Sequence, residues 1–156
     1  MPLLLMPALC ADAGRIAEIH MAAFSSNAML RAQFPMPALR ESLQNTIELK
    51  ALADIDDPKT TVLVVRDVPD NETDQAQHES LTRELNGANA RLRDPVVAFA
   101  KWSHPVADGE DYTEPPWLWP KGTNWEVLES WTKKTEEAQQ RALGQRPCYR
   151  TFAISI

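Results

Sequence analysis

Three histidines are the side chains of this sequence best suited to acid–base chemistry near neutral pH. His104 follows a strand-like run and precedes a proline, so it could lie in a cleft at a strand end, although a turn-forming His-Pro pair is the simpler interpretation. His20 stands at helical spacing from Ile16 and Phe24, which favours a packed structural histidine over a catalytic one. His78 lies in a polar stretch and is expected to be solvated.

The segment after His104 combines acidic and aromatic residues. Its carboxylates, beside Tyr112 and two tryptophans, could attract a cationic amine that the aromatic rings would then cover. Charges also gather on loops because loops are wet, and tryptophans fold loops back onto a core. We favour this second, structural interpretation. The acidic residues are Asp108, Glu110, Asp111 and Glu114, and the tryptophans are Trp117 and Trp119.

No complete catalytic or ligand-binding motif surrounds these residues. The five glycines are isolated, so the sequence has no Gly-rich phosphate-binding loop. Cys10 and Cys148 have no Cys or His neighbours at the spacing of a zinc site, and we expect no metal cofactor. Two lone cysteines are typical of a reducing compartment, so we expect a cytoplasmic protein in which they form no disulfide.

Composition restricts the class of protein. The chain has 156 residues, 44% of them hydrophobic, which suits one globular domain over residues 1–156. The net charge of −6 argues against a nucleic-acid partner, which clustered Lys and Arg would have to bind. No apolar run approaches the roughly 20 residues that span a bilayer, so no membrane partner is expected. The apolar start of the chain lacks basic residues and is broken by Pro7, which favours a first strand at residues 3–6 over a signal peptide.

The spacing of apolar residues predicts three helices. Asp12 precedes the first, and we expect its carboxylate to accept an N–H of the first turn. Gly144 is the expected stop of the third. The helices are predicted over residues 13–24, from Pro37 to a stop at Asp54, Asp56, Asp57 and Pro58, and over residues 127–142.

Three further segments read as strands. Residues 60–66 are β-branched and apolar, as in a strand buried on both faces, and residues 96–102 form a similar run. The polar stretch between them, about 69–95, is predicted to be a surface insertion in an antiparallel hairpin. Residues 149–156 alternate and predict a last strand. The fold class is therefore α/β (α+β), with a mostly antiparallel central sheet flanked by helices.

Six segments form an ordered set: RIAEIHMAAF at 15–24, PKTTVLVVRD at 58–67, FAKWSHP at 99–105, DYTEPPW at 111–117, WTKKTEEA at 131–138 and RPCYR at 146–150. Together they resemble the GCN5-related N-acetyltransferase (GNAT) superfamily, and more narrowly its members in filamentous fungi. The resemblance covers nearly the whole chain outside the insertion. It implies a partial fold of that family, in which the chain ends at the fourth strand.

The same resemblance implies direct transfer of an acetyl group from acetyl-CoA to an amine, either a small molecule or a protein amine. The thioester arm would lie along the fourth strand, at the backbone of Phe152, Ala153 and Ile154. A general base or a water relay would remove the amine proton, and His104 and Glu110 are candidates for the base by their placement. The expected lining of an acceptor site is Phe24, Phe34, Trp102 and Tyr112.

One departure from the family pattern bears on activity. The family's pyrophosphate motif, Arg/Gln-x-x-Gly-x-Gly/Ala, is expected shortly after the strand that carries Phe152, and the 156 residues do not contain it. We therefore expect impaired transfer. The alternatives are a catalytically inactive GNAT-like interaction or ligand-binding module, or a truncated fragment. We also expect the last strand to have a free edge through which the chain self-associates.

Overall fold

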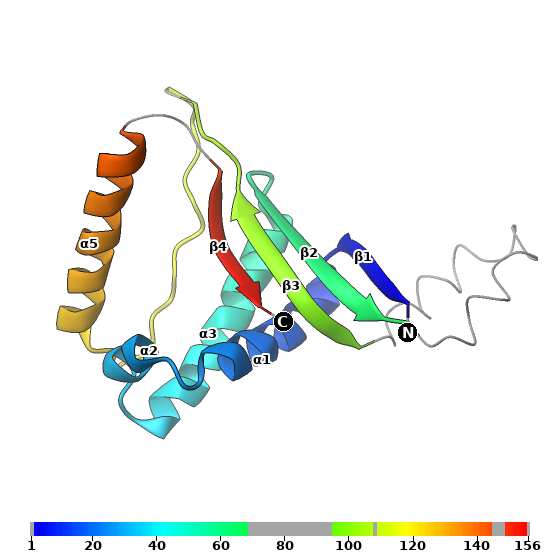
Figure 1. The fold of residues 1–156 in the computed structure, drawn as a ribbon, viewed down its shortest axis with the longest axis horizontal. Helices are drawn as coiled ribbons and strands as arrows, with labels where there is room; N and C mark the ends of the chain where they lie inside the picture. Colours follow the sequence, from blue (N-terminus) through cyan, green and yellow to red (C-terminus); the bar gives the residue numbers. More distant parts are fainter. Residues whose placement is uncertain (1, 69–94, 108, 145–148, 156) are drawn as a thin grey trace, which may run out of the picture.

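The computed structural model describes residues 2–68, 95–107, 109–144 and 149–155, and it places the side chains of these residues except those of 150–155 (Figure 1). His78, Cys148 and almost all of the insertion predicted at 69–95 lie outside the described residues. None of the described helices has the length and apolar composition needed to cross a bilayer.

One antiparallel sheet of four strands, in the order β1-β2-β3-β4, forms the centre of the fold (Figure 1). Each strand lies within a residue or two of its predicted position, and 60–66 and 96–102 pair as the predicted hairpin. The predicted fold class is confirmed. The strands are β1 (Leu3–Pro7), β2 (Thr60–Asp67), β3 (Val96–Ser103) and β4 (Arg150–Ser155).

The helices form two groups. The predicted first and second helices, α1 and α3, pack against one face of the sheet, whereas α5 stands apart from the sheet beside α2 (Figure 1). Gly144 ends α5 as predicted, with a φ of 62° that favours glycine. The helices are α1 (Ala13–Phe24), α2 (Ala28–Gln33), α3 (Pro37–Asp56) and α5 (Trp125–Leu143), and a single 3-10 turn covers Cys10–Asp12.

Two apolar clusters hold these layers together. In the first, Ile16 and Ile19 of α1 pack with Val64 and Phe99 of the sheet. The second joins α1, α2 and α3 and consists of Ala17, Leu30, Phe34, Leu39, Leu43 and Ile47. The two loop tryptophans predicted to fold back onto a core, Trp117 and Trp119, pack against this second cluster.

Two local predictions are wrong. Asp12 precedes α1, but its carboxylate caps no N–H of that helix. It accepts instead from the Leu9 N–H at 2.9 Å and from Arg66 Nη2 at 2.5 Å, because a buried guanidinium binds a carboxylate more strongly than a neutral N–H does. Strand β2 is not buried on both faces: Val62, Val64 and Arg66 are buried towards the helices, and the residues between them are only half-buried.

One helix was not predicted from the sequence. The six-residue helix α2 is too short for apolar periodicity to show, and Asn27 begins it by accepting from the N–H groups of Met29 and Leu30 at 2.8 and 3.2 Å. Helix α3 ends at Asp56, inside the stop predicted at Asp54, Asp56, Asp57 and Pro58, and the Asp54 carboxylate in its last turn is buried in ion pairs.

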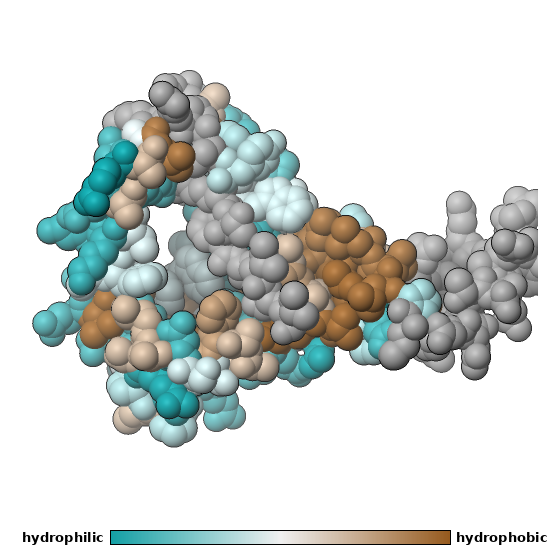
Figure 2. All heavy atoms as spheres, in the orientation of Figure 1, coloured by the Kyte–Doolittle hydropathy of each residue, from teal (hydrophilic) through white to brown (hydrophobic). Residues whose placement is uncertain are grey.

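The second face of the sheet has no helical layer among the described residues (Figure 1). Leu3 and Leu5 of β1 remain 66% and 63% exposed there. An apolar patch lies over β1 and the adjoining parts of β2 and β3 (Figure 2). By the strand register, this face carries the polar Thr61 and Asp67 and the larger apolar set Leu3, Leu5, Leu63, Val65, Ala98, Ala100 and Trp102.

Candidate functional site

A buried carboxylate on the helix side of the sheet forms ion pairs with two lysines. Asp54 Oδ1 accepts from Lys50 Nζ, one turn earlier in α3, and its Oδ2 accepts from Lys101 Nζ of β3, each at 2.6 Å. The Lys50 and Asp54 side chains are 2% exposed and that of Lys101 is 13% exposed. These two ammonium groups and one carboxylate leave one positive charge in excess, and a buried excess charge needs a further carboxylate to balance it.

The 104–124 loop supplies that balance. Glu114 Oε1 accepts from Lys50 Nζ at 3.2 Å, so two carboxylates face two ammonium groups. The ring of Trp117 lies 6.0 Å from Lys50 Nζ and 5.6 Å from Lys101 Nζ, within the range of a cation–π interaction. We call Lys50, Asp54, Lys101, Glu114 and Trp117 the lysine–carboxylate cluster.

Sequence reasoning missed this cluster, although a signal for it was present. Lys50 and Asp54 stand three and seven residues after Ile47, on the same stripe of α3 as the apolar residues. Lys101 likewise shares the buried face of β3 with Phe99. Charged residues at positions that periodicity assigns to the core indicate a buried ion pair.

A second set of bonds ties the loop to the start of β2. The Tyr112 hydroxyl donates to Asp57 Oδ2 at 2.6 Å, and the carboxylate also accepts from the Lys59 N–H and the Thr60 hydroxyl. Burial alone would raise the pKa of Asp57, but these hydrogen bonds outweigh it and hold the pKa below its ordinary value of 3.8. Burial and the same bond to Asp57 raise the pKa of Tyr112.

Both predicted general-base candidates lie near this junction, and each has a polar partner there. His104 Nε2 is 2.7 Å from Thr61 Oγ1, and the ring lies 5.7 Å from that of Tyr149. Glu110 is ion-paired with Lys59, and this hydrogen bond lowers the pKa of the Glu110 carboxyl.

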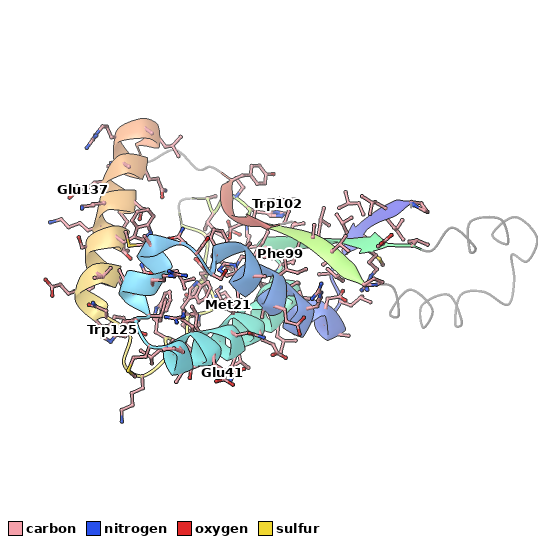
Figure 3. All side chains as sticks on the ribbon, turned by 60° about the horizontal axis from the view of Figure 1, so that its bottom comes forward. Met21, Glu41, Phe99, Trp102, Trp125 and Glu137 are labelled. Atoms are coloured by element: carbon pink, nitrogen blue, oxygen red, sulfur yellow. The ribbon has the colours of Figure 1, made fainter. Side chains whose placement is uncertain are left out.

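The residues predicted to line an acceptor site lie on different surfaces. Phe24 is half-buried at the end of α1, and Phe34 is buried and stacks on Trp119 at 6.1 Å. Tyr112 reaches Asp57 as described. Trp102 lies across the sheet from Phe99, on the face without helices (Figure 3).

The predicted cofactor residues lie in β4, where only the backbone is described. Ala153 pairs with Lys101, and Ile154 pairs with Ala100, both on the β3 side. Their side chains, and that of Phe152, lie outside the description. Within the described ranges, no group of three His, Cys, Asp or Glu side chains could hold a metal ion, and Cys10 is a free, exposed thiol.

His20 lies beside the lysine–carboxylate cluster. Its half-buried ring is 4.8 Å from that of Phe24 and 6.5 Å from that of Phe99, which faces α1 near Met21 (Figure 3). Burial, and then the positive charge of Lys101, lower the pKa of His20 below its ordinary value of 6.5. His20 is therefore a neutral imidazole at pH 7.

Comparison with known proteins gives one distant likeness. No family model and no curated protein matches the chain. A solved structure described as histone acetyltransferase HPA2 and related acetyltransferase, from Corynebacterium glutamicum, matches with a TM-score of 0.39 and 15% identity. The match covers 99% of this chain and 93% of that one. A likeness of this size does not decide the family.

Proposed function

We propose that this chain is a GNAT-type N-acyltransferase domain of the cytoplasm that transfers an acetyl group from acetyl-CoA to an amine, with impaired activity. The ordered segments that resemble the superfamily support the proposal, including its narrower likeness to members in filamentous fungi. So does the element order in part: a strand and helices precede the antiparallel strands β2, β3 and β4, although α5 lies between β3 and β4.

The position of β4 is the observation that carries the proposal. This strand pairs with β3 on one side, and no strand among the described residues pairs with its other side. A free strand edge presents alternating N–H and C=O groups, to which an extended ligand can add like a further strand. The two amides of the pantetheine arm of acetyl-CoA suit such an edge.

The reaction needs two events at that edge. The amine nitrogen attacks the thioester carbonyl, a C–N bond forms, the C–S bond breaks and the CoA thiolate leaves. The amine loses a proton to a base, and the thiolate takes up a proton from water or from that base. A group that can accept a proton, directly or through a water molecule, must therefore lie beside the arm.

Release of free CoA thiol in the presence of acetyl-CoA and an amine tests the proposal. The acceptor panel should hold a polyamine, an aromatic amine and a peptide with a free N-terminus, with an amine-free reaction as the control. We expect slow, amine-dependent thiol release and an acetylated product by mass spectrometry. No amine-dependent release at millimolar acetyl-CoA would contradict the proposal.

Binding should depend on the arm more than on the nucleotide. The sequence contains no motif for the pyrophosphate, so we expect acetyl-CoA to bind with a Kd near the millimolar range, equivalent to about 4 kcal/mol. Pantetheine should then compete almost as well as CoA. A micromolar Kd in titration calorimetry, equivalent to about 8 kcal/mol, would show that other residues hold the nucleotide.

The second candidate is a catalytically inactive interaction module. The exposed apolar face around Leu3 and Leu5 favours it, because large exposed apolar patches mark interaction sites. A chain that releases no thiol in the assay but loses a binding partner on Leu5→Lys substitution would support this alternative.

A further inference from the structure

We propose that His20 is the general base that takes the proton from the acceptor amine. The inference rests on the proposed acetyl transfer and names a residue that the resemblance did not supply. It also departs from the purely structural role that helical spacing favoured for this histidine.

The position of His20 suits the role. Helix α1 lies on the helix side of the sheet and contacts both β3 and β4. Phe99, whose ring lies 6.5 Å from the imidazole, pairs with Ser155 of β4 across the β3–β4 ladder. The imidazole is therefore about one strand away from the edge proposed to hold the thioester arm. Phe24 and Phe99 give it an apolar surround that limits water.

The ring nitrogens of His20 have no partner among the described side chains and backbone groups. A half-buried imidazole usually donates from one nitrogen and accepts at the other. His104 meets part of that requirement through Thr61, at 2.7 Å. The nitrogens of His20 are available to a ligand, and an amine N–H can donate to the unprotonated one.

The charges around His20 keep it in the accepting form. Burial and the Lys101 ammonium group favour the neutral imidazole. That ammonium is fixed in place, because Asp54 of α3 binds it at 2.6 Å, while Lys50 occupies the other oxygen of the same carboxylate. Protonation of His20 at low pH would remove the base, so transfer should fall as the pH drops through the pKa of His20.

The experiment compares three variants in the thiol-release assay. We expect His20→Gln to lower kcat/KM by about 100-fold, the lower end of the effect of a general base, with the KM for acetyl-CoA little changed. Glu18→Gln, an exposed change on the same helix, is the control for a neutral substitution in α1. His104→Gln tests the other histidine considered as a base. We expect kcat/KM to fall further in His20→Gln than in His104→Gln.

A pH profile distinguishes a general base from a packing residue, because a packing residue would not set the pH at which kcat/KM falls. The acidic limb of wild-type kcat/KM should match the pKa of His20 measured by NMR of its ring. Lys101→Met should raise both values together, because it removes the charge that disfavours the imidazolium ion. This comparison holds even if His20→Gln unfolds, which a melting curve would show.

The outcomes separate the two proposals. Two results would overturn the assignment of His20 and leave the proposed function standing. In the first, the wild type transfers acetyl groups and His20→Gln keeps the wild-type kcat/KM. In the second, the acidic limb of the kcat/KM profile does not follow the pKa of His20 measured by NMR. If the wild type releases no thiol with any amine, both are overturned.

Discussion

Asp54 is the residue on which the lysine–carboxylate cluster depends. Replacing it with Ala would remove the carboxylate that binds both Lys50 and Lys101, while the half-exposed Glu114 would still bind Lys50. Breaking a buried ion pair in this way costs roughly 3–5 kcal/mol. We expect a loss of this size in urea unfolding of Asp54→Ala, against a loss within about 0.5 kcal/mol for the exposed Asp111→Ala. Equal losses would mean that the buried cluster contributes no stability.

The Tyr112 hydroxyl should make stability depend on pH. The pKa of Asp57 is lowered in the folded chain, so its contribution to stability is complete above the unfolded pKa and is lost as the pH falls through the folded pKa. Tyr112→Phe removes one of the responsible hydrogen bonds and should cost about 1 kcal/mol at pH 7.

The comparison of unfolding at pH 7 and pH 3 checks this. The difference in the free energy of unfolding between the wild type and Tyr112→Phe should be smaller at pH 3 than at pH 7, because a fall in pH towards the folded pKa of Asp57 protonates the carboxylate that accepts the bond. Tyr149→Phe is the matched control, since this tyrosine is exposed and keeps its ring contact with His104 when the hydroxyl is removed. A difference in the free energy of unfolding that stays constant with pH would show that the Tyr112 hydroxyl does not act through the Asp57 carboxylate.

At the scale of single elements, the short helix α2 depends on its first residue. The Asn27 side chain accepts from two N–H groups of the first turn, so Asn27→Ala should cost about 1 kcal/mol. Asn45→Ala, an exposed change inside α3, should leave the free energy of unfolding almost unchanged or raise it slightly, because alanine is the better helix former. Thermal unfolding of both variants distinguishes a cap from a general effect of losing asparagine.

Helix α5 is held through one buried side chain. Leu128 is the buried residue of α5, whereas the larger Trp131 is 46% exposed. Leu128→Ala should therefore cost about 2–3 kcal/mol in urea unfolding, and Trp131→Ala less than about 1 kcal/mol, despite the larger volume removed. The reverse order would mean that the α5 surface carrying Trp131 is covered in solution.

The elements that the sequence predicted are those with long, regular apolar spacing. Helices α1 and α3 and strands β2 and β3 bury one face each, and burial imposes the periodicity that the residues show. Helix α2 makes fewer than two turns and is fixed by its Asn27 cap, so periodicity could not reveal it. The cap expected at Asp12 failed because Arg66, far away in sequence, binds that carboxylate.

The candidate site was harder to predict than the fold. Lys50, Asp54 and Lys101 come from two elements, and nothing in the local sequence says that one carboxylate binds both lysines. The availability of the His20 nitrogens likewise follows from what surrounds the ring in space. Sequence spacing placed the histidine on α1 correctly, but spacing does not show which nitrogens have partners.

At the scale of the whole molecule, the two sheet edges differ. β1 is flanked by Pro2 and ends at Pro7, and proline has no N–H with which to extend a ladder. The sequence of β4 contains no proline and a single charged residue, Arg150 at its first position, so little of it protects the edge. We therefore propose that the chain self-associates through β4 at micromolar concentration.

Sedimentation over a concentration series tests self-association. We expect the average mass to rise with concentration, both in the wild type and in Leu5→Lys, which changes the open apolar face but not the β4 edge. Loss of association in Leu5→Lys would assign it to the face instead. A stable monomer throughout would contradict the proposal.

The pairing of β1 with β2 has a consequence for the growing chain on the ribosome. Pro7 finds its partner only at Leu63, so the first strand emerges long before any sheet can form. At about 5–20 residues per second, the wait lasts several seconds, during which Leu3, Leu4 and Leu5 have no strand to join. We therefore expect the apolar segment of Leu3, Leu4 and Leu5 to need protection from aggregation during this wait, and slower translation through α3 would lengthen it.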